Sequence, residues 1–169
     1  LLNRGNPNQP GVLVSAAVPA ALVAKQPIFE AADSLTSRRR ISLARWIMSS
    51  DNSLTRRVIV NRVWQYHFGA GLVRTPNDFG VRGRLPTHPE LLDWLATWFS
   101  DQAEYSLKKL HRLIMTSRTY ATSSRTHPAN LDQGRDRDID NLYLSHFPLR
   151  RLEVEAIRDS MLFVSGRLN

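Results

Sequence analysis

The sequence predicts an all-α fold of about five helices, with a long loop punctuated by glycine and proline after the central helix. Three observations predict it. Apolar side chains recur at helical spacing in five segments. Residues that start or stop helices stand at the ends of several of these segments. The segment 54–68 is apolar almost all round, as expected of a helix at the centre of a domain.

The first part of the chain differs from the rest. Residues 1–34 show little periodicity and contain Pro10, Pro19 and Pro27, so we expect an extended arm or an inter-domain linker. The remaining residues, 35–169, are expected to form one helical domain that is incomplete at its C-terminal end. A chain of 169 residues is long enough to bury a core of one domain.

Two adjacent helices follow the arm. The first is predicted over 36–49, and its arginines face solvent or bind phosphate or carboxylate groups. Asn52 or Ser53 is a suitable N-cap for the second helix, 54–68. Gly69 then ends this helix as a C-terminal glycine cap.

The helix 54–68 carries two polar residues of interest. Asn61 lies on its narrow polar stripe, whereas Arg62 falls between Val58 and Tyr66 on an apolar side. A buried guanidinium is costly without a partner, so we expect Arg62 to meet a carboxylate or a carbonyl group. The expected carboxylates, Glu155 and Asp159, come from the last helix. Ligand binding by Arg62 is the alternative to this structural role.

The loop 69–87 is long for a compact domain, which indicates either a function or internal polar contacts. Arg74 and Asp78 are expected to pair and hold it in place. If the loop carries an enzyme site instead, Asp78, His67 and Glu155 are the residues expected to converge there. The substrate of such a hydrolase would be a polysaccharide.

Three further helices are predicted beyond the loop. Thr87 and Glu90 form a capping box before helix 88–101, and Ser106 caps helix 107–120. A short helix is possible near 128–134, and the last helix spans 149–165. Its buried side is expected to consist of Leu149, Leu152, Ala156, Ile157, Met161 and Val164.

Composition excludes several classes of site. The absence of cysteine rules out disulfides, thiolate catalysis and cysteine-ligated metal or haem within this segment. No window is apolar enough for a transmembrane helix. The net charge is +8, and the whole excess lies between residues 35 and 84. Because 20 of the 23 basic residues are arginine, ion-paired arginines are favoured over nucleic-acid binding, for which the basic face 38–57 is the candidate.

Catalytic motifs do not appear. The five histidines include no pair at i,i+4, so a zinc-hydrolase helix is absent, as are a nucleophile elbow and a P-loop. We therefore predict no metal site and no cofactor in this segment. The candidate buried polar or ligand-binding residues are Asn61, Arg62, His67, Arg74, Asp78, Glu155, Arg158 and Asp159.

The order of several motifs resembles one known family, the domain of unknown function 1553, also called the planctomycete PSD1 domain. The resemblance covers about residues 36–168. Its motifs are LARW (43–46), NRVWQYHFGAGLVRTPNDFG (61–80), PTHPELLD (86–93), LHRLI (110–114), SRTY (117–120) and RRLEVEAIRD (150–159). The family often has proline where this chain has Ser53.

The resemblance implies a context rather than a reaction. Such domains are similar to C-terminal parts of large exported proteins, which often carry a c-type cytochrome module upstream. The leading hypothesis is a non-catalytic helical docking or ligand-recognition module of an extracytoplasmic protein, because the chain is rich in arginine and aspartate but has no catalytic constellation. Its expected partners are other domains of the same polypeptide, with polysaccharide as a further candidate. Haem c would belong to an upstream domain.

Overall fold

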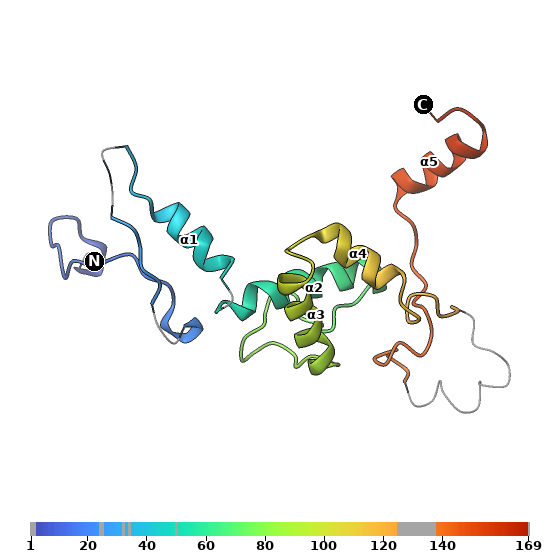
Figure 1. Ribbon diagram of the computed structural model, residues 1–169, viewed down its shortest axis with the longest axis horizontal. Helices are drawn as coiled ribbons and strands as arrows, with labels where there is room; N and C mark the ends of the chain where they lie inside the picture. Colours follow the sequence, from blue (N-terminus) through green and yellow to red (C-terminus); the bar gives the residue numbers. More distant parts are fainter. Residues whose placement is uncertain are drawn as a thin grey trace.

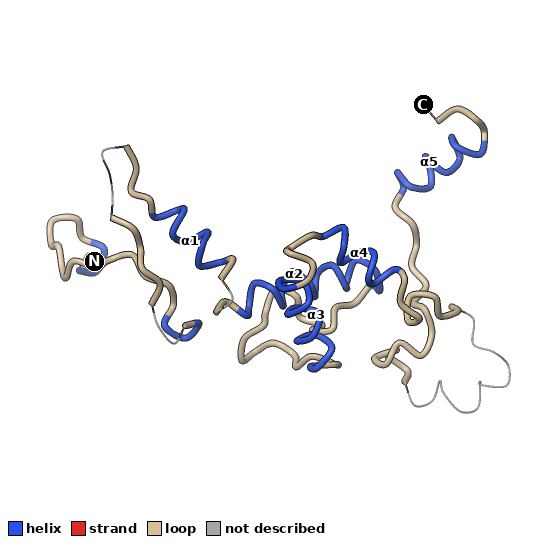
Figure 2. Tube along the Cα trace, viewed as in Figure 1, coloured by secondary structure: helices blue, strands red, loops and turns tan. Residues whose placement is uncertain are grey.

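The computed structural model describes residues 3–23, 26–31, 33, 35–49, 51–124 and 138–168. Five α-helices and no strands are found in these residues, which confirms the predicted all-α class (Figures 1 and 2). The helices are α1 (Arg39–Ile47), α2 (Ser53–Phe68), α3 (Pro89–Asp101), α4 (Leu107–Met115) and α5 (Val154–Val164). Two short 3-10 helices, Asn3–Gly5 and Ala20–Leu22, lie in the N-terminal arm. The possible helix near 128–134 falls outside the described residues.

Helix α2 has the ends that the sequence predicts. The side chain of Asn52 accepts a hydrogen bond from the backbone N–H of Thr55 at 3.2 Å, which satisfies one of the free donors of the first turn. At the other end Gly69 has a φ of +81°, and its N–H donates to the Gln65 carbonyl. Glycine adopts this backbone conformation without steric cost, so the helix stops there.

Helices α3 and α4 depart from their expected ends. Pro89 starts α3, but Thr87 does not cap it. The Thr87 N–H and hydroxyl instead both donate to the Leu72 carbonyl, which ties the two ends of the long loop together. Ser106 caps α4 as predicted. This helix ends at Met115 rather than at residue 120. Directly after it, the Thr116 hydroxyl donates back to the Arg112 carbonyl.

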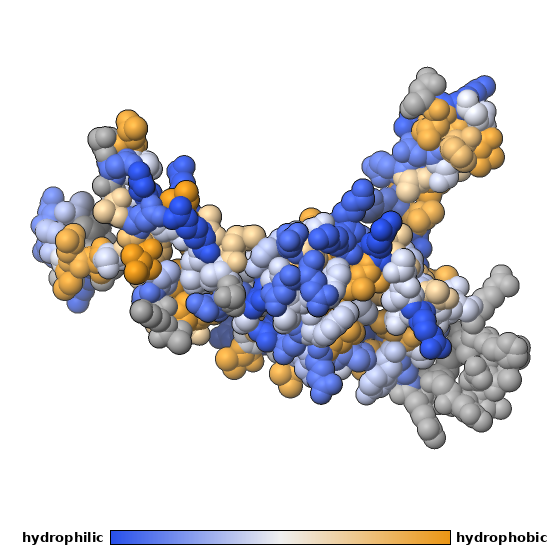
Figure 3. All heavy atoms as spheres, in the orientation of Figure 1, coloured by the Kyte–Doolittle hydropathy of each residue, from blue (hydrophilic) through white to orange (hydrophobic). Residues whose placement is uncertain are grey.

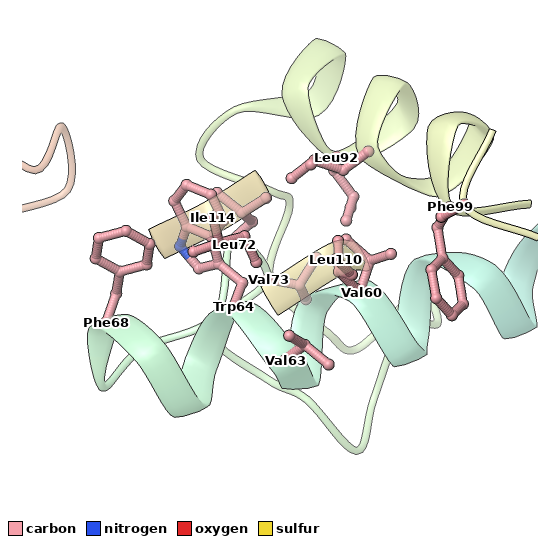
Figure 4. Close-up of a cluster of buried hydrophobic side chains, with 12 residues drawn as sticks. Val60, Val63, Trp64, Phe68, Leu72, Val73, Leu92, Phe99, Leu110 and Ile114 are labelled. Carbon is pink, nitrogen blue, oxygen red and sulfur yellow. The ribbon is translucent and has the colours of Figure 1, made fainter. Parts of the chain in front are cut away.

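The core lies between α2, α3 and α4, with α2 packed against both of the others (Figure 4). Leu72 and Val73 of the long loop close it from a further side. Its members from the helices and their connections are Val60, Val63, Trp64, Phe68, Leu92, Leu95, Phe99, Ala103, Leu110 and Ile114. The prediction that 54–68 is the central helix is consistent with this packing.

Helix α1 buries little. Only Ser42 of this helix is buried. The apolar Ile41 and Leu43, and Met48 directly after the helix, are 41–49% exposed. The helix is anchored to the arm by charge, because Arg38 pairs with Asp33 and Glu30, and Arg45 pairs with Glu30.

Helix α5 contradicts the predicted burial most clearly. It begins at Val154, so Leu149 and Leu152 precede it, and every residue of the helix is exposed or half-buried. Met161 is 68% exposed and Val164 is 86% exposed. Figure 1 shows α5 standing apart from the α2–α4 core, and Figure 3 shows apolar side chains at its surface. Helix α5 is amphipathic as predicted, but the described residues supply no surface that covers its apolar face.

Candidate functional site

Asn61 is fully buried and joins α2 to the long loop. Its side-chain amide donates to the Val73 carbonyl at 3.0 Å, and its oxygen accepts from the Val73 N–H at 2.8 Å. A Cβ added at Gly71 would lie 2.6 Å from the Asn61 amide nitrogen, so the loop passes this close only with glycine there. Asn61 is thus a structural residue inside the core and does not lie on a solvated stripe.

Arg62 is exposed, and its predicted burial was wrong. Tyr66, its neighbour one turn on, is 76% exposed, because α3 and α4 cover the opposite side of α2. The Arg62 guanidinium donates to Asn77 Oδ1 at 3.1 Å. Its expected partners, Glu155 and Asp159, lie on α5 and form no ion pair with it among the described residues.

Arg62 lines a hollow of about 510 Å³ at the C-terminal end of α2. Arg150, from the segment before α5, lines the same hollow and donates to the Tyr66 carbonyl. Gln65 and Asn77 complete its polar wall. Three stretches of sequence therefore meet here: α2, the loop after it, and the chain leading into α5.

A second hollow, of about 430 Å³, shares Tyr66 and Arg150 with the first. His67 lines it, and His67 Nε2 lies 2.8 Å from His111 Nδ1 of α4. Tyr120 packs edge-on against the His67 ring with centroids 5.5 Å apart. One histidine nitrogen must donate and the other accept in such a pair, so it requires at least one neutral ring.

The environment of His67 favours its neutral form. Burial lowers the pKa of His67, and electrostatic interactions with His111 and Arg150 lower it further. The pair is thus a half-buried polar contact between α2 and α4, supported by an aromatic cluster. Phe68, Tyr120 and Phe147 pack against one another at centroid separations of 5.3–5.9 Å, and Tyr120 joins this cluster to His67.

The long loop is held by contacts that differ from the predicted pair. Arg74 does not pair with Asp78 but donates to the Asp140 carbonyl at 2.8 Å. Asp78 accepts from the Gly80 N–H at 2.8 Å and forms a local turn. Arg74 lines a smaller hollow of about 240 Å³ under residues 140–144.

The three candidate residues on α5 form no hydrogen bond or ion pair with the other candidate residues among the described segments. Arg158 pairs with Asp159 at 3.5 Å, and Glu155 is exposed. Asp78, His67 and Glu155 therefore occupy three separate settings, with no hydrogen bond or ion pair joining them in the described residues.

Three residues that neighbour the predicted candidates are not predicted by the sequence. Asn77 and Arg150 line the first hollow, and His111 binds His67. The sequence contains one signal for Arg150, since it begins the RRLEVEAIRD motif, but the periodicity places that motif in a helix with one buried side. Nothing in the spacing of His67 and His111 indicates that they touch.

Neither metal ligation nor membrane crossing finds support in the described segments. No three His, Cys, Asp or Glu side chains gather there as a metal site would require. None of the described helices has the length and apolar character needed to cross a bilayer.

Comparison with known proteins identifies a family. No curated protein and no solved structure matches the chain. Residues 39–169 match the family PSD1, described as a protein of unknown function (DUF1553). This match covers most of the chain and nearly all of its helical part, as the motif order predicted. The chain therefore belongs to the PSD1 (DUF1553) family.

Proposed function

We propose that the chain is a docking module whose α5 helix binds another domain of the same polypeptide. The observation that carries this proposal is the exposed apolar face of α5. Val154, Ile157, Met161 and Val164 recur at helical spacing on that face, and none of them is buried.

The low stability of a short helix in isolation supports a partner surface that covers the apolar face of α5. Isolated helices of fewer than about 12–15 residues are marginal in water, and most helix stability in proteins comes from packing an apolar face. Helix α5 has 11 residues and no side-chain N-cap. Its C-terminal end is well formed, since the Gly166 and Arg167 N–H groups bond back to the Phe163 and Leu162 carbonyls.

The polar face of α5 favours a protein partner over a lipid surface. It carries Glu155, Arg158 and Asp159, so both signs of charge alternate along it. Helices that lie on membranes carry mainly Lys and Arg on this face.

The two other hypotheses receive less support. A hydrolase site on the 69–87 loop needs His67, Asp78 and Glu155 to converge, and each has its own setting. Nucleic-acid binding needs a basic 38–57 face with arginines turned outward. Three of the arginines in this range, Arg38, Arg45 and Arg57, already bind carboxylates within the chain, whereas Arg39 and Arg40 are exposed. The exported setting and the neighbouring cytochrome module, which the resemblance implies, stay predictions.

Photo-crosslinking in the full-length polypeptide tests the docking proposal. A benzoylphenylalanine in place of Met161 lies on the apolar face, and the same probe in place of Asp159 lies on the opposite face and serves as the matched control. We expect crosslinks from position 161 to another domain of the same chain, and few from position 159. Crosslinks only to a second copy, or equal yields at both positions, would overturn the proposal.

A further inference from the structure

We propose that Arg62 and Arg150 form a binding site for an oxyanion, a phosphate or carboxylate group, in the hollow at the C-terminal end of α2. This site is separate from the apolar face of α5 and does not depend on docking by that helix. Its ligand would be a molecule that carries the anionic group on a larger body, because the hollow of about 510 Å³ exceeds what a single small anion fills.

The charge in this hollow is uncompensated within the described part of the chain. Neither Arg62 nor Arg150 forms an ion pair there, and the described residues that line the hollow include no Asp or Glu. Four other described arginines, Arg38, Arg45, Arg57 and Arg158, pair with carboxylates. Arg62 and Arg150 differ from these four because they line one hollow together without a carboxylate. The two guanidinium groups that share this hollow are therefore placed to attract a negative charge from outside.

The donors in the hollow are held in place by the protein. Arg62 donates to Asn77 Oδ1 at 3.1 Å, and Arg150 donates to the Tyr66 carbonyl. A guanidinium has five N–H donors in a planar fork, so each arginine retains donors beyond the one that fixes it. Because Asn77 accepts through its oxygen, its Nδ2 group is a further donor on the same wall.

The position of the hollow sets its ligand chemistry. The backbone at the end of α2 presents carbonyl oxygens, which repel an anion, but Arg150 covers the Tyr66 carbonyl. Guanidinium forks match the paired oxygens of both carboxylate and phosphate. Tyr66, which is 76% exposed, stands between this hollow and the one beside His67, and its ring offers a surface for the body of the ligand.

Side-chain NMR of the 169-residue chain tests the site without assuming a natural ligand. Inorganic phosphate and acetate are titrated separately at constant ionic strength, and the arginine Nε–H signals are followed. We expect saturable shifts at Arg62 and Arg150, and none with chloride alone. Tighter binding of phosphate would identify a phosphate-bearing ligand, and tighter binding of acetate a carboxylate-bearing one, and either result supports the site.

Three variants decide whether these arginines are responsible. R62Q and R150Q should each weaken anion binding by about tenfold or more, because each removes charge-assisted hydrogen bonds. R158Q changes an exposed arginine on α5 and should leave binding unchanged. Backbone amide spectra confirm that each variant is folded. Absence of saturation by either anion in the wild type, or unchanged binding in the R62Q/R150Q double variant, would overturn the proposal.

Discussion

Helices α3 and α5 have similar amphipathic patterns, but the apolar face of α3 is buried and that of α5 is exposed. Leu92, Leu95 and Phe99 of α3 are each 2% exposed because they pack onto α2. In α5 the corresponding apolar residues remain in contact with water. The difference shows that periodicity identifies the face that a helix will bury, but not the surface that will bury it. In this chain the α2–α4 core supplies that surface for α3 and not for α5.

The core and the outer helices also hold different kinds of polar contact. Inside the core, Asn61 binds a backbone N–H and a backbone carbonyl that would otherwise be buried without partners. Around α1 and α5 the charged pairs are exposed, and such pairs contribute little to stability. Substitutions in the two regions should therefore differ in size as well as in location.

The largest expected difference concerns two phenylalanines. Phe99 is 2% exposed and Phe163 is 73% exposed. Phe99→Ala should cost about 3–5 kcal/mol of unfolding free energy, because it leaves a cavity in the core. Phe163→Ala should change it by less than about 0.5 kcal/mol. Urea unfolding followed by circular dichroism measures both, with the milder Phe99→Leu as a second core variant. Equal losses at the two positions would contradict the separation of core and α5.

Asn61→Ala should rank second, at about 2–4 kcal/mol, because it leaves both polar groups of Val73 buried and unpaired. The matched control is Asn77→Ala, an exposed asparagine whose side chain binds Arg62 alone among the described residues. Thermal unfolding of the two variants gives the comparison. If Asn61→Ala were as stable as Asn77→Ala, the role assigned to Asn61 would be wrong.

Removing the cap of α2 should have a smaller effect. Asn52→Ala loses the hydrogen bond to the Thr55 N–H and should cost about 1 kcal/mol. Asn52→Asp retains an acceptor at this position and serves as the control. A urea midpoint for Asn52→Ala equal to that of the aspartate variant would show that the side chain does not act as a cap.

The smallest expected change depends on pH. The folded state lowers the pKa of His67 from its ordinary value of 6.5, chiefly through burial. The contribution of neutral His67 to the free energy of unfolding is therefore fully present above pH 6.5. It is lost as the pH falls through the lower pKa that His67 has in the folded state. Urea midpoints measured between about pH 8 and pH 5 should decline on acidification. His67→Phe should flatten this decline, whereas His146→Asn, outside the pair, should not. An identical decline in His67→Phe would assign the pH dependence to other groups.

Much of the fold could be predicted because its signals are local. Asn52, Ser106 and Gly69 act at helix ends within a few residues of themselves, so the sequence alone places them. Thr87 was misassigned for the opposite reason. Its partner is the Leu72 carbonyl, which is near only after the long loop has closed.

The candidate site was harder to predict because its residues come from distant segments. Arg62 was expected to be buried because a helical projection shows its neighbours on α2 but not which side α3 and α4 cover. Arg150 and Asn77 approach Arg62 only in the folded chain. The family match supplies the order of these motifs and assigns no role to any of them.

Native-state hydrogen exchange of the 169-residue chain tests the central claim most directly. The claim is that α2, α3 and α4 form a self-sufficient core, while α5 has its apolar face uncovered. We predict that amides in the middle of α2 exchange only through global unfolding, and that amides of α5 exchange close to the rate of an unprotected peptide. Protection of α5 equal to that of α2 would contradict the account.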